Sequence, residues 1–402
     1  MTVWDALIGQ AEAVDSLRAA AAAAADVVAG DSVGVQARHT TSAAMTHSWL
    51  FTGPPGSGRS VAARAFAAAL QCETPGALGC GHCAACHTVA SRTHPDVHQV
   101  VPQGLSIGVE EMRAVVARSG RRPSRGRWQV VVIEDADRLT EQASNALLKA
   151  VEEPPGRTVF LLCAPSLHPD DVSVTIRSRC RLVTLRTPSA EAVAGVLRDA
   201  DVEPGMAAWA AAAGQGHVGR SRRLARDADA RERRAAVLAV PASLTSLGAC
   251  LDAADHLVGA AEAEAKALSD DLDASETESL QVALGAGATG KGVAASVRGS
   301  AGALRELERR QKSRTTRTQR DALDRALVDL AAFYRDVLLV HAGSQVAPAH
   351  PDFADDVRTV ASRVDASGAL RRLDAVLACR DAVELNVKPR IAVEAMTAAL
   401  RL

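Results

Sequence analysis

A chain of 402 residues, 48% of them hydrophobic, is long enough for two or three globular domains and too apolar to be disordered. It holds no run of about 18 apolar residues that would predict a membrane span, and its start lacks the pattern of a signal peptide. We therefore expect a cytoplasmic protein without membrane contact. The formal net charge of −1 excludes a global basic field, so any contact with nucleic acid must come from a local patch.

Residues 1–48 begin with a short helical pattern, and the segment 19–46, rich in Ala, Gly, Ser and Thr, is predicted to be partly helical and then a loop. Short runs that are apolar on both faces follow and alternate with helical stretches; these runs are 49–51, 130–133, 159–162 and 182–185. Buried parallel strands show this pattern, and the helices between them indicate βα units. We therefore expect an α/β domain with a parallel sheet over residues 1–186.

From about residue 187 the pattern becomes helical throughout. Thr187 and Pro188 are predicted to cap and open a helix, and residues 187–228 predict a small helical unit that ends in a segment rich in Gly and Arg. Beyond residue 229 no strand pattern is convincing, and apolar residues from Leu323 to Leu338 recur at helical spacing. Residues 229–402 are therefore expected to form an all-α domain, with a loop at 285–292.

The sharpest motif is a glycine-rich segment between the first predicted strand and a helix expected from Val61 to about Gln71. Its candidate phosphate-binding residues are Gly53, Gly56, Ser57, Gly58, Arg59 and Ser60, and they match G-x-x-x-x-G-K-[ST] except that Arg59 replaces the lysine. Glycines let backbone N–H groups curl around phosphates, and a helix N-terminus adds a favourable field. We expect a site for ATP or ADP that the larger, forked guanidinium weakens or alters. An ordinary glycine-rich turn is the alternative.

Two carboxylates, Glu134 and Asp135, follow the strand predicted at residues 130–133. Carboxylates at that place can hold Mg²⁺ and orient water in proteins that hydrolyse ATP with such a loop. A solvated acidic strand end is the alternative.

Four of the eight cysteines are crowded into one segment, as Cys72, Cys80, Cys83 and Cys86 with the spacing C-x7-C-x2-C-x2-C. Four thiolates can surround Zn²⁺ tetrahedrally in a closed structural site, so we predict a zinc-binding insert at about 72–86. His82 or His87 could replace one thiolate, and disulfide pairing is the alternative, disfavoured in a reducing cytoplasm. A bacterial iron–sulfur run would need a cysteine where this chain has Ala90.

Two stretches are rich in arginine. Residues 118–127 are expected to form a loop that is either solvated or faces phosphates, and Trp128 is the only aromatic residue beside it, too little for a platform that stacks single-stranded bases. Residues 309–320 are denser in positive charge. This stretch could contact either another subunit or DNA.

Three segments together resemble the AAA+ clamp-loader family of bacterial DNA polymerase III. Residues 135–140 (Asp-Ala-Asp-Arg-Leu-Thr) and 146–155 (Ala-Leu-Leu-Lys-Ala-Val-Glu-Glu-Pro-Pro) resemble its Walker B region, and Ser178-Arg179-Cys180 resembles its Ser-Arg-Cys motif. The resemblance is strong over about 47–230. It is looser at residues 386–390 (Asn-Val-Lys-Pro-Arg) and at the start of the chain, where Trp4-Asp5 and Ile8-Gly9-Gln10 are similar to the family's opening.

The resemblance implies a division of the chain and a role for one arginine. It implies a P-loop AAA+ domain over residues 1–186, a helical lid over 187–228 and a collar that mediates oligomerisation over 229–402. It also implies that Arg179 reaches the ATP bound on a neighbouring subunit, because an arginine supplied in trans stabilises charge on a transferring phosphate. A role in a surface salt bridge is the alternative for Arg179. The family resemblance favours zinc in the cysteine insert as well.

Four ATPase elements depart from the motor subunits of that family. Arg59 replaces lysine, Glu134 and Asp135 reverse the usual order, Ala164 replaces threonine, and Gly219 stands at the position of the lid arginine. Together they predict a subunit that turns over ATP poorly yet keeps Arg179 for its neighbour, as delta-prime subunits do.

That resemblance implies partners of the gamma/tau and delta types, and contact with the sliding clamp and primed DNA through the complex. Two other functions remain open. One is an active AAA+ motor of gamma/tau type, against which Arg59 argues. The other is a zinc-bearing nucleic-acid-binding module, against which the near-zero net charge argues.

Overall fold

The computed structural model describes residues 2–32, 44–124, 126–284 and 293–402. They form two compact units, Met1–Pro102 with Ser106–Arg222, and Gln103–Leu105 with Arg223–Leu402. Each unit is described by itself. The loop predicted at 285–292 and residues 33–43 of the segment predicted at 19–46 lie outside the described residues.

The first unit is built on a five-stranded sheet with the order β2-β3-β4-β1-β5. Its strands are β1 (Ser48–Thr52), β2 (Val97–Val100), β3 (Gln129–Ile133), β4 (Thr158–Ala164) and β5 (Arg181–Thr184). Every neighbouring pair is parallel, and Leu50 of β1 lies beside Leu162 of β4. The predicted parallel sheet is therefore confirmed. The central strands β1, β3 and β4 are buried along their whole length, which explains why they are apolar on both faces.

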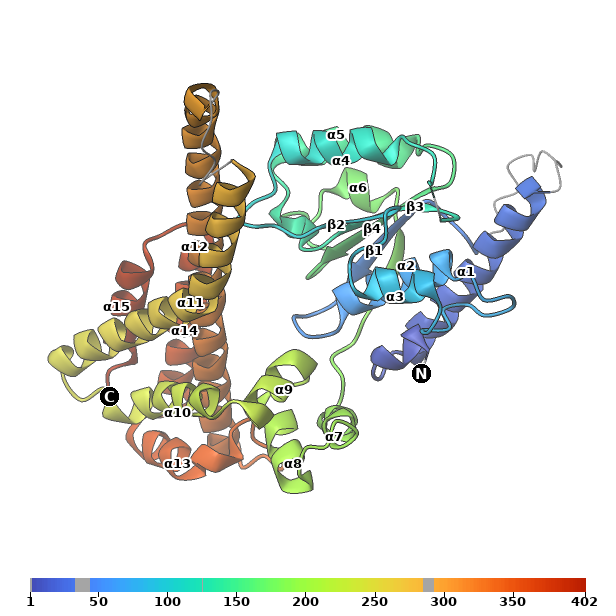
Figure 1. Ribbon diagram of the computed structural model, residues 1–402. Coiled ribbons are helices and arrows are strands. Elements are labelled where there is room, and N and C mark those ends of the chain that lie inside the picture. The colour runs from blue at the N-terminus through green and yellow to red at the C-terminus, as the bar shows by residue number, and fades with distance from the viewer. Residues whose placement is uncertain (1, 33–43, 125, 285–292) are drawn as a thin grey trace. The chain divides into compact units, whose positions relative to one another are not determined.

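Helices cover both faces of this sheet (Figure 1). The helical elements of the first unit are η1 (Val3–Ala6), α1 (Ala11–Ser32), α2 (Arg59–Gln71), α3 (Ala84–Ala90), α4 (Val109–Ser119), η2 (Ala136–Arg138), α5 (Glu141–Glu152), α6 (Val174–Arg177), α7 (Ala190–Arg198) and α8 (Pro204–Ala213). Trp49 and Phe51 pack into a core with α1, α2 and α3, while Leu50 points into a second core with α4, α5 and α6. This alternation follows from the period of two along a strand.

The alanine-rich segment near the N-terminus is a true helix. Ala20, Ala21, Ala23 and Ala24 are buried in α1, which continues to Ser32. Alanine has the highest helix propensity, and its small side chain lets α1 pack closely on α2. The start of α7 corrects a prediction, because Ser189 and not Thr187 is the N-cap and its hydroxyl accepts from the N–H of Ala192.

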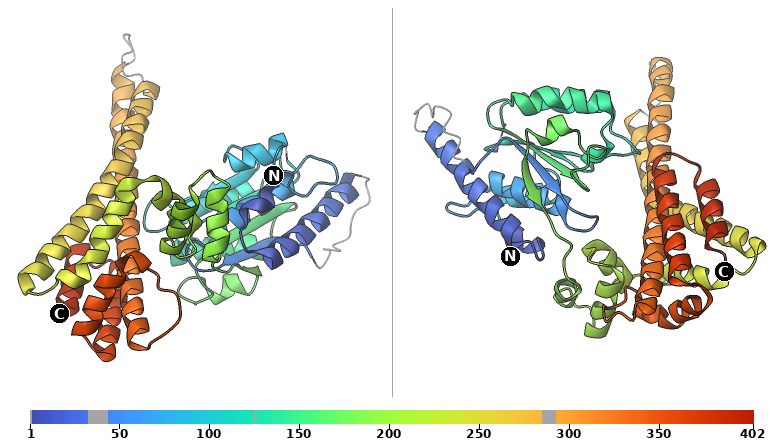
Figure 2. Two further views of the ribbon diagram at one scale, coloured as in Figure 1. Left: turned by 90° about the horizontal axis from the view of Figure 1, so that it is seen from below. Right: turned by 180° about the vertical axis from the view of Figure 1, so that it is seen from behind.

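The second unit is helical in every element that the structure describes. After α9 (Val218–Arg226), which leads from the first unit, it contains α10 (Ala228–Ser243), α11 (Leu247–Ala283), α12 (Val293–His341), η3 (Pro351–Phe353), α13 (Ala354–Arg363), α14 (Ala366–Glu384) and α15 (Pro389–Leu400). The long helices α11 and α12 lie side by side (Figure 2). The predicted apolar stripe of α12 is confirmed, because Leu327, Phe333 and Val337 are buried in the core of this unit.

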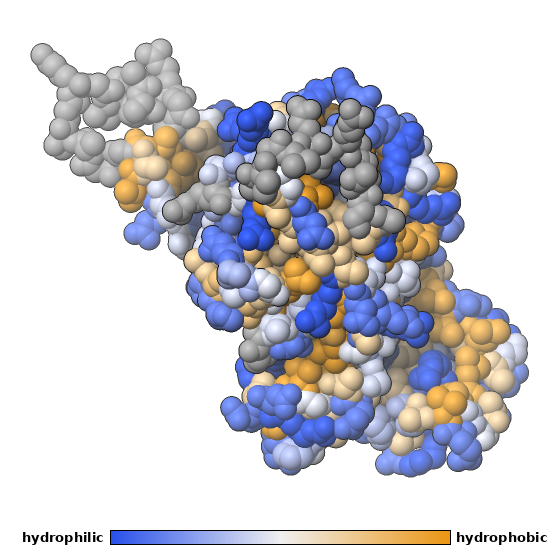
Figure 3. All heavy atoms as spheres, turned by 90° about the vertical axis from the view of Figure 1, so that its right-hand side faces the viewer, coloured by the Kyte–Doolittle hydropathy of each residue, from blue (hydrophilic) through white to orange (hydrophobic). Residues whose placement is uncertain are grey.

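Exposed large apolar side chains occur on several elements, and five of them lie on α11, namely Leu247, Leu251, Leu268, Leu272 and Val282. Figure 3 shows hydrophobic side chains as separate patches among hydrophilic ones on the visible face. Within the described part of the chain, the structure has no helix that combines the length and the apolar character of a membrane span.

Candidate functional site

The glycine-rich loop connects β1 to α2 at the carboxyl edge of the sheet. Gly53, Gly56 and Gly58 have φ values of 155°, 86° and 93°, a region that favours glycine. A Cβ on Gly53 would lie 2.4 Å from the carbonyl oxygen of Leu185, so no larger residue fits there. The helix predicted from Val61 begins at Arg59 in the structure. The loop therefore has the backbone path of a phosphate cradle, with the N-terminus of a 13-residue helix behind it.

Arg59 turns back onto the loop from which it projects. Its Nη1 donates a hydrogen bond of 2.6 Å to the carbonyl oxygen of Gly53. A lysine at this position would place a compact ammonium near β- and γ-phosphates, whereas this guanidinium is partly satisfied by the loop itself. The departure in sequence at Arg59 is thus also a departure in geometry.

A second side chain covers the loop from the segment before α9. The Cβ, Cα and Cγ atoms of His217 are so close to Gly56 that a Cβ on Gly56 would lie 2.6 to 2.7 Å from them. The ring Nδ1 of His217 accepts a hydrogen bond from the N–H of Arg220, which fixes the ring at the start of that helix. His217 was not predicted from the sequence. The only residue singled out in this segment was Gly219, which stands at the position of the lid arginine.

Gln10 joins the loop to the end of the sheet. Its side-chain amide donates to the carbonyl oxygens of Ser57 and Arg186, and its Oε1 accepts from the N–H of Arg186. The side chain is buried, so it holds the loop in place and is not available to bind a nucleotide. The similarity of residues 8–10 to the family's opening drew attention to Gln10 but did not predict these contacts.

The carboxylate after β3 is already paired. Oε1 of Glu134 lies 2.9 Å from Nη1 of Arg64 on α2 and 3.8 Å from Nη2 of Arg92. Its side chain is only 14% exposed, so the pair is shielded from water. A carboxylate held this way offers less charge to Mg²⁺ than a free one. Asp135 adopts a left-handed backbone with φ of 54° and caps η2.

The candidate trans arginine lies away from the glycine-rich loop. Arg179 follows the short helix α6, and 38% of its side chain is exposed. Its Nη1 donates to the carbonyl oxygen of Thr175, and its Nη2 lies 2.7 Å from Oε1 of Glu152. The structure therefore places Arg179 at the surface and in an ion pair, which is the alternative that the sequence left open. Ala164 is fully buried at the end of β4.

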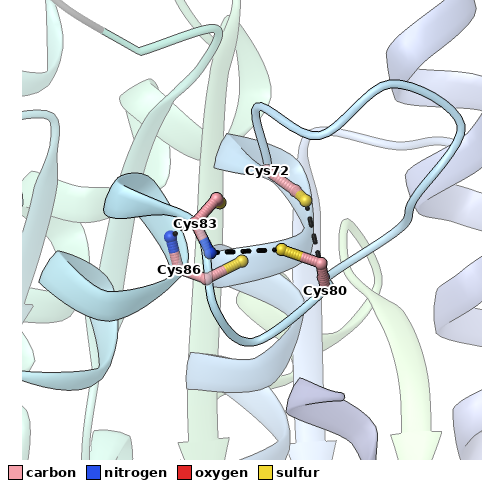
Figure 4. Close-up of side chains that lie close together, drawn as sticks. All are labelled: Cys72, Cys80, Cys83 and Cys86. Carbon is pink, nitrogen blue, oxygen red and sulfur yellow. Dashed lines mark hydrogen bonds between the residues drawn. The ribbon is translucent and has the colours of Figure 1, made fainter. Parts of the chain in front are cut away.

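The four predicted cysteine ligands come together, as Figure 4 shows. Cys72 follows α2, Cys80 lies in the loop, Cys83 caps α3, and Cys86 lies on α3; their four Sγ atoms all lie within 4.8 Å of one another. All eight cysteines are free, so the disulfide alternative is not what the structure contains. Neither His82 nor His87 belongs to the group among the described residues. Four cysteines at these separations can hold one metal ion.

Backbone N–H groups support charge on these sulfur atoms. The N–H of Cys83 donates to Sγ of Cys80 at 3.3 Å, and the N–H of Cys86 donates to Sγ of Cys83 at 3.4 Å. The hydrogen bond from the Thr74 hydroxyl, together with the backbone N–H groups of His82 and Cys83, lowers the pKa of Cys80 to about 5, while burial raises the pKa of Cys86. A metal ion would hold the buried thiol of Cys86 as thiolate as well.

The two arginine-rich stretches have different surroundings. In the loop after α4, Asp96 accepts hydrogen bonds from the N–H and the hydroxyl of Ser124, which fixes a loop whose Arg121 and Arg122 are exposed. Residues 309–320 belong to α12, where Arg314 pairs with Asp273 and Glu276 of α11. Much of the positive charge of Arg314 therefore serves to join two helices.

Comparisons with known proteins agree with the motifs. Residues 33–189 match the family model described as DNA polymerase III, delta subunit. DNA polymerase III subunit delta-prime of Pseudomonas aeruginosa is 39% identical over 149 residues, which cover 36% of this chain and 45% of that protein. Subunit tau of Bacillus subtilis is 34% identical over 151 residues, 37% of this chain and 26% of that protein. A gamma subunit-related protein of Thermotoga maritima matches with a TM-score of 0.34 and 17% identity over 88% of this chain and 93% of that one.

The chain spans less than half the length of each of these two curated relatives. The matched segment coincides with the α/β unit that carries the glycine-rich loop, the cysteine cluster and the Ser-Arg-Cys motif. The family model and the curated relatives confirm the resemblance of the chain to the clamp-loader family and, within it, to the delta-prime subunits of bacterial DNA polymerase III.

Proposed function

We propose that the chain is a delta-prime-type subunit of the replicative clamp loader. In this role it assembles with subunits of the gamma/tau and delta types, helps to load the sliding clamp onto primed DNA, and supplies Arg179 to the ATP site of a neighbour. Residues 1–186 act as the AAA+ domain, residues 187–228 as a lid and residues 229–402 as the collar for oligomerisation. Zinc held by the four cysteines is structural, and ATP or ADP with Mg²⁺ binds only weakly at the altered loop.

The observation that supports this role is the contrast between two places in the first unit. At the glycine-rich loop, Arg59 bonds to Gly53 and Glu134 is paired with Arg64, so the residues expected to act on ATP are engaged within the chain. At the edge beyond α6, Arg179 is exposed enough to meet a partner. A subunit with a poor ATP site and a presented arginine contributes to hydrolysis on another subunit.

The zinc assignment follows from the chemistry of the four ligands. Thiolates are soft ligands that select zinc or iron–sulfur clusters, and a closed tetrahedral set of four is typical of structural zinc. Trp4 donates from its indole to the carbonyl oxygen of Leu78, and the N–H of Val3 donates to Gly79. The cysteine loop is therefore tied to the N-terminal segment, and the metal would stabilise both.

The test of the proposed function is Arg179→Ala in a reconstituted clamp loader. An arginine supplied in trans is worth about 10³–10⁵ in rate at the site it serves. Since that site is one of several, we expect a smaller but clear loss of DNA- and clamp-stimulated ATP hydrolysis, and a loss of clamp loading. Arg177→Ala is the matched control, because Arg177 is exposed two residues earlier and, among the described residues, bonds only to the carbonyl oxygen of Leu167.

Circular dichroism and co-purification establish that the Arg179→Ala chain folds and assembles. An assembled mutant complex that hydrolyses ATP and loads clamps at the wild-type rate would show that Arg179 has only a structural role.

A second candidate function is a motor subunit of the gamma/tau type. The similarity to subunit tau of Bacillus subtilis, nearly as high as that to the delta-prime relative, favours it. The two functions differ in ATP turnover by the isolated chain, which a motor performs and a delta-prime-type subunit does not.

A further inference from the structure

Arg179 is held by a residue from a different helix. Its Nη2 lies 2.7 Å from Oε1 of Glu152, the last residue of α5, and its Nη1 donates to the carbonyl oxygen of Thr175 at 2.9 Å and to the hydroxyl of Ser178 at 3.2 Å. The two charged side chains are 38% and 42% exposed. The ion pair is therefore on the surface, within reach of another protein.

One partner of this ion pair ends a helix, and the other lies in the turn two residues after a helix. Helix α5 begins at the Thr140 cap and buries Leu147 and Ala150, while the short helix α6 begins at the Ser173 cap and buries Ile176. Leu147 and Ile176 belong to the same hydrophobic core, and the two helices are in contact. The positions of Glu152 and Arg179 relative to each other are thus determined by packing, so their side chains meet without a large loss of backbone freedom.

The contacts of Arg179 involve the two terminal nitrogens of its guanidinium group. An arginine side chain has five N–H donors in a planar fork. Nη1 donates to Thr175 and Ser178, and Nη2 lies beside Glu152, so among the described residues none of these contacts involves the Nε–H. The Nε–H and the N–H of Nη2 parallel to it form the edge that can make two hydrogen bonds to a phosphate or carboxylate.

We propose that Glu152 is a positioning residue for Arg179. Its carboxylate, together with the carbonyl of Thr175, fixes the guanidinium so that the remaining edge is presented to the phosphates of a nucleotide on a neighbouring subunit. The inference rests on the proposed function, in which Arg179 acts in trans. Positioned groups contribute to rate because their orientation need not be acquired during the reaction.

The adjacent residue provides a matched control. Glu153 follows Glu152 directly, is exposed, carries the same charge, and makes no ion pair among the described residues. A general effect of negative charge at the end of α5 would be equal for both residues, whereas a positioning effect belongs to Glu152 alone.

The test uses clamp-loader complexes reconstituted with Glu152→Ala, Glu152→Gln, Glu153→Ala or Arg179→Ala chains. We expect Glu152→Ala to lower kcat for DNA-stimulated ATP hydrolysis by about tenfold at the affected site, with KM for ATP unchanged. Glu152→Gln keeps an oxygen acceptor of the same reach, so it should retain most of the rate. Glu153→Ala should match the wild type.

The outcomes separate the inference from the proposed function. If Arg179→Ala lowers kcat and Glu152→Ala does not, the positioning role is wrong and the trans arginine stands. A higher rate in both Glu152 variants would also overturn the inference, since it would mean that Glu152 competes with phosphate for Arg179. An equal loss of kcat in the Glu153→Ala chain would show that the effect comes from the negative charge at the end of α5 and not from positioning of Arg179. If Arg179→Ala leaves kcat unchanged, the proposed function and this inference are both wrong.

Discussion

The glycine-rich loop shows how one residue type can change the character of a site. Arg59 donates to Gly53, and Arg64 neutralises Glu134, so two guanidinium groups are engaged where phosphates and Mg²⁺ would need free partners. Lysine forms fewer fixed bonds of this kind, because its ammonium is a compact charge on a flexible stem. The same chain keeps a lysine at Lys149 of α5, so lysine is not excluded from the α/β unit.

The cysteine cluster leads to a prediction on single residues. We expect metal analysis of protein purified under reducing conditions to find about one zinc ion per chain. The Cys80→Ser chain should bind almost no zinc and should have a lower Tm, because three thiolates leave the tetrahedral set of ligands incomplete. Cys379→Ala is the control, since Cys379 lies in the second unit. Zinc near zero in the wild-type protein, or iron with visible absorbance, would contradict the assignment.

At the scale of the elements, a buried polar network joins three parts of the second unit. Arg234 of α10 bonds to Asp352 of η3 and to Nδ1 of His350, and Nε2 of His350 lies 3.1 Å from the carbonyl oxygen of Asp329 on α12. Asp336 accepts from the N–H of His350. Since Nδ1 accepts from a guanidinium, the imidazole is neutral and carries its proton on Nε2.

This network predicts how the second unit responds to acid. Burial lowers the pKa of His350, so the folded chain holds it neutral while the unfolded chain takes up a proton below about pH 6.5. The unfolded state then binds more protons, and the free energy of unfolding falls as the pH falls through that value. We expect Tm to decrease from pH 7.5 to pH 5.5, and His350→Gln to reduce this decrease.

The matched control is His256→Gln, because His256 is exposed on α11 of the same unit. Equal pH dependence of Tm in the His350→Gln and wild-type chains would show that His350 does not control the acid response.

The elements also show which structural features a sequence pattern can predict. Strands β1, β3 and β4 were predicted because burial on both faces requires continuous apolar runs. Strand β2 was missed, because it lies at the sheet edge and exposes His98 and Gln99 in part. Motif spacing identified the glycine-rich loop and the cysteines, and the family resemblance identified Arg179. The contacts of Gln10, His217, Arg64 and Glu152 could not be predicted, since tertiary packing brings them together.

At the scale of the whole molecule, the two units carry different tasks in the proposed function. The first holds the glycine-rich loop, the cysteine cluster and Arg179, and the match to the family model falls within it. The second consists of helices whose interior is apolar and whose long pair α11 and α12 is joined by Arg314 and its two acidic partners. Such a helical unit suits a scaffold for oligomerisation, while nucleotide chemistry depends on the first.

The engaged residues of the first unit predict that the isolated chain turns over ATP far below the ~1 per second scale of ordinary enzymes. Arg59→Lys should raise affinity for ATP, since it frees the carbonyl of Gly53 and supplies a compact charge, yet leave turnover low because Glu134 remains paired with Arg64. Equilibrium binding of a fluorescent ATP analogue and steady-state phosphate release measure the two effects, with a gamma/tau subunit assayed in parallel. Turnover near 1 per second by the wild-type chain would instead identify a motor. Weak binding without hydrolysis agrees with the proposed function, because the glycines and the N-terminus of α2 still favour phosphate.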